Sequence, residues 1–271
     1  MSAPSDGQVC SRTGMYLLPG RGEEGYRVTK DRYVQSGGVN SARENTHIGP
    51  MSPDMIDGRG RFDTMGRTVY FADGARTAFA EVLQVFRQRR LAVAPDAEAA
   101  GMSYEEYLDA VAEEAQRDGR DAPWSVPCDW QMLHSIYRVR MPTQGWWVAI
   151  DHPETHAALT DALAVDVYQL GYQDGAALHS GLLASDDREL TTIVANYVRG
   201  LFLEDGSPPL GISFPSKTEL GRCWAFWNRR ADDGLDPSVN DPVLEEEWNV
   251  DGEAFRYVAE LYRLQVLGTS G

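Results

Sequence analysis

The stretch GRGRFDTMGRTVYFADGARTAFAEV, residues 58–82, decides how the chain is read. It opens with a glycine-rich turn that carries two arginines, and a short run of branched and aromatic residues, Val69 to Ala72, then predicts a strand. Apolar residues recur at helical spacing from there to about Arg90, which predicts a helix with Asp73 as its N-cap. The unit is either an ordinary strand–turn–helix or one wall of a pocket for an anionic ligand.

The residue types in this stretch suit an anionic, ring-bearing ligand. Arginine binds phosphate in a planar, bidentate geometry, so Arg61 is a candidate phosphate ligand, and Gly58 and Gly60 would let the backbone approach closely. Tyr70 can stack on a flat ring, and Glu81 lies just beyond the apolar stripe of the helix. Taken singly, Arg61 and Glu81 are more typical of a solvated surface, so only a wider pattern gives them a function.

Composition limits the classes of function. The chain has 271 residues, 42% of them hydrophobic, which is enough for one large domain or two small ones. Its net charge of −16 disfavours direct binding to nucleic acid. Three widely spaced cysteines, Cys10, Cys128 and Cys223, predict a reducing, cytoplasmic setting. Neither a signal peptide nor an apolar run of membrane-spanning length is evident, so we expect no membrane contact.

The order of elements predicts an α+β fold, because strands and helices mix without regular βαβ units. Branched and aromatic residues predict strands near 26–28, 69–72, 136–141, 146–150, 211–216 and 224–227. Apolar periodicity predicts helices near 73–90, 103–117, 153–163, 190–201 and 253–267. Residues 31–60 are rich in glycine and are expected to form long loops.

Several common catalytic signatures are missing from the sequence. The segment HPETH, residues 152–156, spaces two histidines four apart but is not the HExxH zinc pattern, and its proline is typical of a helix start. We therefore predict no metal. The chain also has no GxSxG elbow and no Walker loop.

Five short motifs in a fixed order give the wider pattern. They are YRV (26–28), GRGRF (58–62), YFA (70–72), AFAE (78–81) and GISFPS (211–216). In this order the chain resembles the RES domain family, NAD-degrading toxins of bacterial toxin–antitoxin pairs whose fold is like that of ADP-ribosyltransferases. The resemblance covers roughly residues 25–90 and 160–228.

The resemblance implies a domain organisation. Residues 1–24 are rich in glycine, serine and charged residues, and this composition predicts a flexible leader. The resemblance makes residues 25–228 a RES-like catalytic domain with an insertion at about 91–160. Residues 229–271 would form a C-terminal helical extension. The expected fold is ADP-ribosyltransferase-like, with mixed sheets, flanking helices and a large insertion.

The resemblance also implies the site. The family's active-site residues fall on Arg61, Tyr70, Glu81 and Ser216. Arg27 matches a recurrent arginine of the first strand and would be a second ligand for the dinucleotide, whereas Arg59 has no firm counterpart. The chain departs from the pattern with Phe71 in place of leucine and with Phe214 in place of tyrosine, which removes a hydroxyl.

The activity implied is cleavage of the nicotinamide–ribose bond of NAD+, which is a substrate here. Glu81 would stabilise the oxocarbenium character of the ribose, Arg61 would hold a phosphate, and Ser216 would bind the ribose or position the acceptor. Water or inorganic phosphate could be the acceptor, and an Xre-like antitoxin would be the partner. A protein ADP-ribosyltransferase and a non-catalytic nucleotide-binding module stay open as alternatives. Convergence of the four residues on one cleft separates an enzyme from a module in which they are dispersed.

Overall fold

The computed structural model describes residues 6–30, 44–45, 59–172 and 177–268. The strands are β1 (Gln8–Val9), β2 (Tyr16–Pro19), β3 (Glu24–Lys30), β4 (Glu44–Asn45), β5 (Gly66–Ala72), β6 (His134–Arg140), β7 (Trp146–Ala149), β8 (Gly211–Pro215), β9 (Arg222–Trp227) and β10 (Val243–Asn249). The helices are α2 (Ala75–Leu91), α3 (Ala94–Ala100), α4 (Tyr104–Arg117), α5 (Cys128–Met132), α6 (Pro153–Ala162), α7 (Ala164–Gln169), α8 (Ser180–Leu183), α9 (Arg188–Arg199), α10 (Arg229–Asp232) and α11 (Glu253–Leu261). The predicted α+β class is confirmed.

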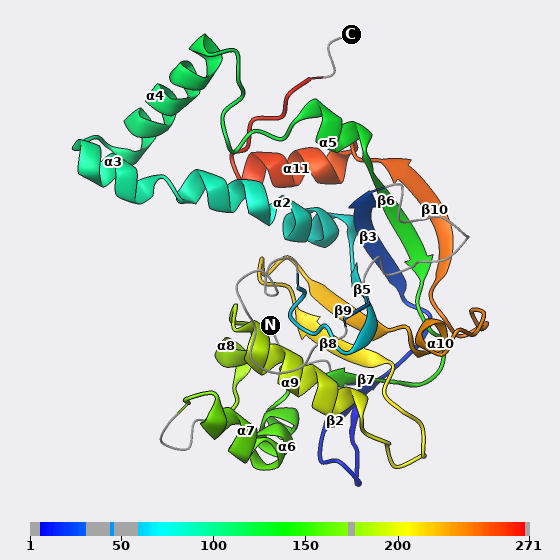
Figure 1. Ribbon diagram of the computed structural model, residues 1–271. Coiled ribbons are helices and arrows are strands. Elements are labelled where there is room, and N and C mark those ends of the chain that lie inside the picture. Colours follow the sequence, from blue (N-terminus) through cyan, green and yellow to red (C-terminus); the bar gives the residue numbers. More distant parts are fainter. Residues whose placement is uncertain (1–5, 31–43, 46–58, 173–176, 269–271) are drawn as a thin grey trace.

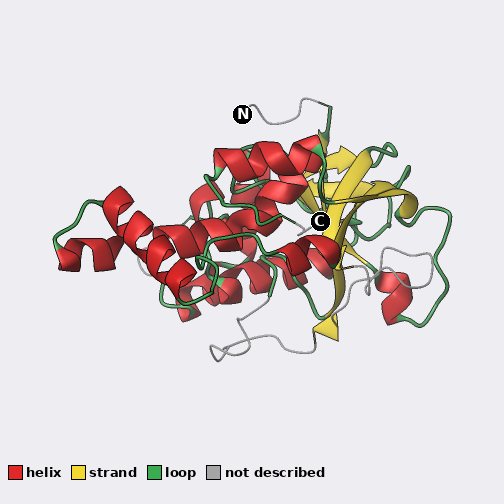
Figure 2. Ribbon diagram, turned by 90° about the horizontal axis from the view of Figure 1, so that it is seen from above, coloured by secondary structure: helices red, strands yellow, loops and turns green. Residues whose placement is uncertain are grey.

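The strands form one mixed sheet with the order β1–β2–β7–β8–β9–β5–β3–β6–β10, and β4 pairs with β5 (Figure 1). Strands β7 and β8 run parallel, and the other pairs are antiparallel. Most of the helices lie on one face of this sheet (Figure 2). Such an arrangement buries one face of the sheet against helices and leaves the other to side chains and loops.

The sheet divides where β3 meets β5. These two strands share a single pair, Tyr26 with Ala72, whereas β3 pairs with β6 along its whole length. One wing is therefore β3–β6–β10 and the other runs from β5 to β1. Helices α2 and α11 cover the first wing, and α6, α7 and α9 accompany the second (Figure 1).

The main core lies between the sheet and its helices. Helix α2 buries Phe79, Leu83 and Phe86, and α9 adds Leu190 and Val194. Side chains on β5 alternate between the two faces, as expected for a strand. A second, smaller cluster on the opposite face consists of Val69, Phe71, Val139, Met141, Trp147 and Phe226.

Most predicted elements are confirmed with shifts of a few residues at their ends. Helix α4 begins with a capping box, in which Ser103 and Glu106 exchange hydrogen bonds. The prediction for Asp73 is wrong by one position, because Gly74 is the N-cap of α2. Asp73 instead accepts hydrogen bonds from the Thr77 hydroxyl (3.0 Å) and the Arg222 amide (2.8 Å). It therefore joins the start of α2 to β9.

The expected flexible leader, residues 1–24, is wrong for its described part. Residues 6–24 include β1 and β2, and β2 pairs with β7 inside the sheet. Met15 and Leu17 are fully buried. The glycines and charges that suggested a loose segment lie at the turns, and the apolar residues between them pack into the core.

The insertion and the C-terminal extension also differ from expectation. Within 91–160, β6 and β7 are integral strands of the sheet, so only the part around α3 and α4 extends away from it (Figure 1). That part has its own small apolar cluster of Leu108, Ala122 and Trp124. Residues 229–271 are not helical throughout, because β10 pairs with β6.

The expected loops at 31–60 lie largely outside the described residues, and Gly58 is among those left out. Across the described part of the chain, no helix has the length and apolar character needed to cross a membrane.

Replacing Leu17 with alanine tests whether β2 belongs to the core. Leu17 is fully buried, so Leu17→Ala should lower the free energy of unfolding by about 2–5 kcal/mol. Val9→Ala on the adjoining strand is the control, because Val9 is 46% exposed and its loss should change stability by about 0.5 kcal/mol or less. Urea unfolding measures both, and a Leu17→Ala protein as stable as the control would contradict the buried strand.

Candidate functional site

A cleft of about 440 Å³ opens where β3 and β5 diverge. Residues from β3, the loop 59–65, β5, α2, the loop between α8 and α9, and the β8–β9 region line it. Four of the five predicted ligand-binding or catalytic side chains, Arg27, Arg61, Tyr70 and Glu81, are in this lining. Ser216 is outside this lining but donates a hydrogen bond to Glu81, which belongs to it. The structure thus brings all five together.

Arg61 is the most unusual of these residues. Its side chain is only 7% exposed, and its guanidinium carbon lies 4.8 Å from the centre of the Phe214 ring. Burial lowers the pKa of Arg61, while the nearby charge of Glu81 opposes this shift. Among the described residues, no protein acceptor takes a hydrogen bond from the guanidinium. A buried arginine with unused donors that lines a cleft is prepared for an anion.

Glu81 is fixed by Ser216. The Ser216 hydroxyl donates a hydrogen bond of 2.5 Å to Glu81 Oε1, and Ser216 is 3% exposed. The Thr218 amide donates to Ser216 Oγ (3.1 Å), which leaves the serine proton for the carboxylate. Ser216 therefore orients Glu81, a contact different from the expected hydrogen bond to a ribose.

Tyr70 holds the loop that carries Arg61. Its hydroxyl donates to Asp63 Oδ1 (2.8 Å) and accepts from the Phe62 amide (2.9 Å), so it is committed to the protein. Its ring packs edge-on against Phe214, with centroids 6.3 Å apart. A Cβ on Gly60 would lie 2.4 Å from the tyrosine oxygen, so this position requires glycine. Burial and the charge of Asp63 raise the pKa of Tyr70 well above its ordinary value.

Arg27, the other predicted arginine, and Arg59, which has no counterpart in the family pattern, differ in position. Arg27 on β3 lines the cleft, and burial lowers its pKa to about 10, so it stays cationic at neutral pH. Arg59 is outside the cleft lining, and its Nη1 donates to Thr192 Oγ1 on α9 (3.3 Å). The second arginine of the GRGRF turn therefore lines the cleft, and the first anchors the loop to α9.

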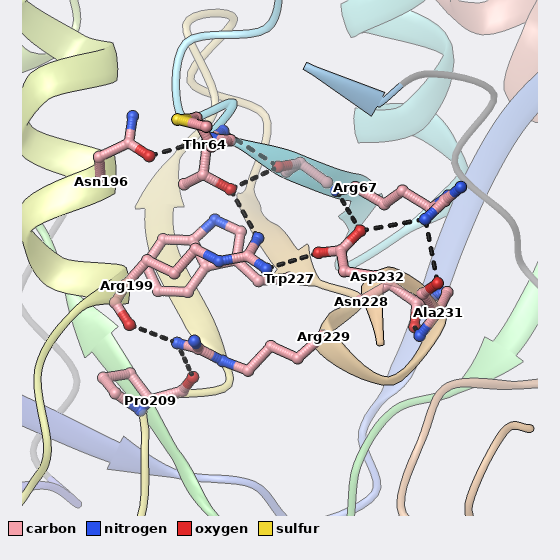
Figure 3. Close-up of polar contacts among 12 residues, drawn as sticks. Thr64, Arg67, Asn196, Arg199, Pro209, Trp227, Asn228, Arg229, Ala231 and Asp232 are labelled. Atoms are coloured by element: carbon pink, nitrogen blue, oxygen red, sulfur yellow. Dashed lines mark hydrogen bonds and ion pairs between the residues drawn. The ribbon is translucent and has the colours of Figure 1, made fainter. Parts of the chain in front are cut away.

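A partly buried polar network joins the same loop to α9 and α10 (Figure 3). Arg199 on α9 donates to Thr64 Oγ1 (2.8 Å) and to Asp232 Oδ2 (2.5 Å). The other oxygen of Asp232 accepts from the amide (2.9 Å) and the guanidinium (3.2 Å) of Arg67. Asn196 Oδ1 accepts from the Met65 amide (3.0 Å). The loop is therefore tied to both α9 and α10.

The sequence analysis missed several residues of the site. The role of Asp63 could have been predicted from the sequence, because an aspartate three residues after a glycine can accept a hydrogen bond from the glycine amide. Asp63 does so with Gly60 at 3.0 Å. The role of Asp232 could not have been predicted, since it lies 165 positions from its partner Arg67. Lys217 follows the matched GISFPS motif directly and lines the cleft. Cys223, on β9, also lines the cleft.

Cys223 should make stability fall at alkaline pH. Burial and the charge of Glu81 raise its thiol pKa well above the ordinary value, so the unfolded chain loses this proton first. The stabilisation is complete below about pH 8.5 and is lost above it, by up to about 1.4 kcal/mol per pH unit. Urea unfolding between pH 7 and pH 10 should therefore show a shallower decline for Cys223→Ala than for the unchanged protein. Parallel declines would show that the thiol titrates normally in the folded state.

Comparisons with known proteins give little beyond this geometry. No protein-family model matches the chain, and no curated protein matches it. One solved structure, the crystal structure of the M. tuberculosis MbcT-MbcA toxin-antitoxin complex, aligns over 96% of this chain and 93% of that chain. The sequence identity is 13% and the TM-score is 0.37, and a likeness of this size carries no functional argument.

Proposed function

We propose that the chain cleaves the nicotinamide–ribose bond of NAD+. The observation that carries the proposal is the position of Arg61, which is 7% exposed, has unused donors and lines a cleft together with Glu81. An arginine in that state favours a phosphate, and a carboxylate beside it favours a developing positive charge. NAD+ supplies both features, because it carries phosphates and its ribose develops oxocarbenium character during the reaction.

The charge of the cleft supports an anionic substrate. Its charged lining residues are Arg27, Arg61, Arg188, Lys217, Glu81 and Asp186. Four cations and two carboxylates leave an excess of two positive charges in a chain whose net charge is −16. A local reversal of sign of this kind attracts an anion to the cleft.

The reaction breaks the bond between ribose C1′ and the nicotinamide nitrogen. The bonding electrons leave with the nicotinamide, which becomes neutral, and C1′ acquires oxocarbenium character. Ser216 holds one oxygen of Glu81, and Oε2 accepts no hydrogen bond from the described residues, so it is available to the ribose. Arg61 would hold a phosphate, with Arg27 as a second cation. Because Ser216 fixes the carboxylate beforehand, little reorganisation is needed during the reaction.

The acceptor then attacks C1′ through oxygen. Water gives ADP-ribose and releases a proton, inorganic phosphate gives ADP-ribose phosphate, and a protein acceptor would make the chain a transferase. The sequence motifs support destruction of NAD+ and, with it, the role of toxin in a toxin–antitoxin pair. On the same basis an Xre-like protein is the expected neutralising partner.

An NAD+-consumption assay tests the proposal. Glu81→Gln keeps the size and the Ser216 contact but removes the charge, so it should lower the rate by about 10²–10³. Glu114→Gln is the matched control, because Glu114 is exposed on α4, away from the cleft. Assays with and without phosphate, with products resolved by mass, identify the acceptor.

Equal rates for Glu81→Gln and Glu114→Gln would contradict the role of Glu81. No consumption by the unchanged protein in either buffer, combined with binding of NAD+, would contradict cleavage and favour a nucleotide-binding module. Consumption that begins only when a protein acceptor is added would favour a transferase.

A further inference from the structure

Two cations share one carboxylate at the outer rim of the cleft. Lys217 Nζ and Arg188 Nη2 both contact Oδ1 of Asp186, the second at 3.0 Å. Lys217 follows Ser216 directly, and Arg188 begins α9. All three rim residues belong to the cleft lining. The predicted functional residues include none of them.

Exposure differs sharply across this group. The Asp186 side chain is 76% exposed, whereas those of Arg188 and Lys217 are 18% and 26% exposed. The cations therefore lie on the inner side and the carboxylate on the solvent side. An exposed carboxylate contributes little to such a pair and can rotate into water at small cost. A phosphate, with more charge and more acceptor oxygens, competes well for the same two donors.

The rim lies close to the inner part of the cleft. The positive charge of Arg188 is one of the causes that lower the pKa of Arg61. Ser216, the neighbour of Lys217, contacts Glu81 at 2.5 Å. When cations line one cleft from two sides, an anion bound between them reduces their mutual repulsion. The inner cation, Arg61, and the outer cations, Arg188 and Lys217, lie at different positions in the cleft. A ligand with two linked anionic groups can therefore contact both, whereas a single anion cannot.

We propose that Lys217 and Arg188 form a second anion subsite that binds the outer phosphate of a pyrophosphate, while Arg61 binds the inner one. Asp186 is a built-in counter-ion that the pyrophosphate displaces. The identity of the ligand, the ADP part of a dinucleotide, rests on the proposed function, but the displacement of Asp186 does not require cleavage. Adenosine, which has no phosphate, gains nothing from this subsite.

The affinity for ADP, measured by isothermal titration calorimetry at low salt, tests this proposal. ADP has no nicotinamide bond to cleave, so binding is read without turnover. Lys217→Gln should weaken ADP binding about ten-fold through the loss of a charge-assisted contact. Asp186→Asn should tighten it several-fold, because the competing charge is gone. Asp118→Asn, which breaks an exposed pair with Arg120, is the matched control and should leave the affinity unchanged.

The tightening by Asp186→Asn is the decisive result, because the loss of a merely structural contact would not strengthen binding. Weaker or unchanged ADP binding in this variant would overturn the proposal, and so would unchanged binding in Lys217→Gln. Adenosine affinity altered to the same extent would also overturn it, since the effect would not involve phosphate. Thermal unfolding of each variant checks that the fold is kept.

The two proposals fail in different ways. The expected ADP pattern in a protein that consumes no NAD+ would overturn cleavage and leave the subsite standing. Consumption of NAD+ with ADP affinities indifferent to both rim variants would overturn the subsite alone. A protein that does not bind ADP at all would also overturn the subsite.

Discussion

The site depends on the hydrogen bonds of one hydroxyl. Tyr70 Oη accepts from the Phe62 amide and donates to Asp63, and so it attaches the loop 59–65 to β5. The Gly60 amide also donates to Asp63, so the loop closes on itself around Arg61. The direction of the Arg61 side chain follows from this attachment. A buried hydroxyl with both roles satisfied is costly to disturb, because either partner would be left without a hydrogen bond. The loop is therefore held in place by contacts within the protein itself.

A preformed loop explains how Arg61 can be buried without a full counter-ion. Removing a guanidinium from water disfavours its charged form, and the pKa of Arg61 is lowered for that reason. Glu81 compensates in part, but no direct ion pair joins the two among the described residues. The rim cations differ, since each has Asp186 as an ion-pair partner. The inner cation thus has no ion-pair partner among the described residues, and the outer cations hold one that can be exchanged.

The sequence predicted the parts of this site that are local. Tyr70 belongs to a strand and Glu81 to a helix, each with a strong periodic pattern, and both line the cleft. The order of short motifs brought in Ser216, which is 135 positions from Glu81. The sequence did not predict contacts between distant segments that carry no motif, such as the ion pairs of Asp232 with Arg199 and Arg67. Their partners are chosen by the packing of α9 and α10 against the loop, which no local pattern encodes.

The place of β2 was missed for a related reason. Glycines and charged residues around it suggested a loose segment, yet its fully buried Leu17 pairs with Val148 of β7, more than a hundred positions away. Strand propensity is weak in so short a run, and pairing decides it. A strand of four residues is therefore the kind of element that sequence alone predicts least well.

The cleft forms where backbone pairing in the sheet is nearly absent, between β3 and β5. Strands β3 and β5 share one residue pair, whereas β3 and β6 share seven, so the first wing is held mainly by β6 and by helices. Helix α2 contacts both β3 and β5 and thus spans the joint, and Glu81 lies on that helix. The distance between Glu81 and Arg61 is therefore set by how the two wings meet. Arg27 on β3 is the cleft cation of the first wing, and Arg61, Arg188 and Lys217 belong to the second. Pyrophosphate bound by Arg27 together with the cations of the second wing would therefore join the two wings where backbone pairing is missing.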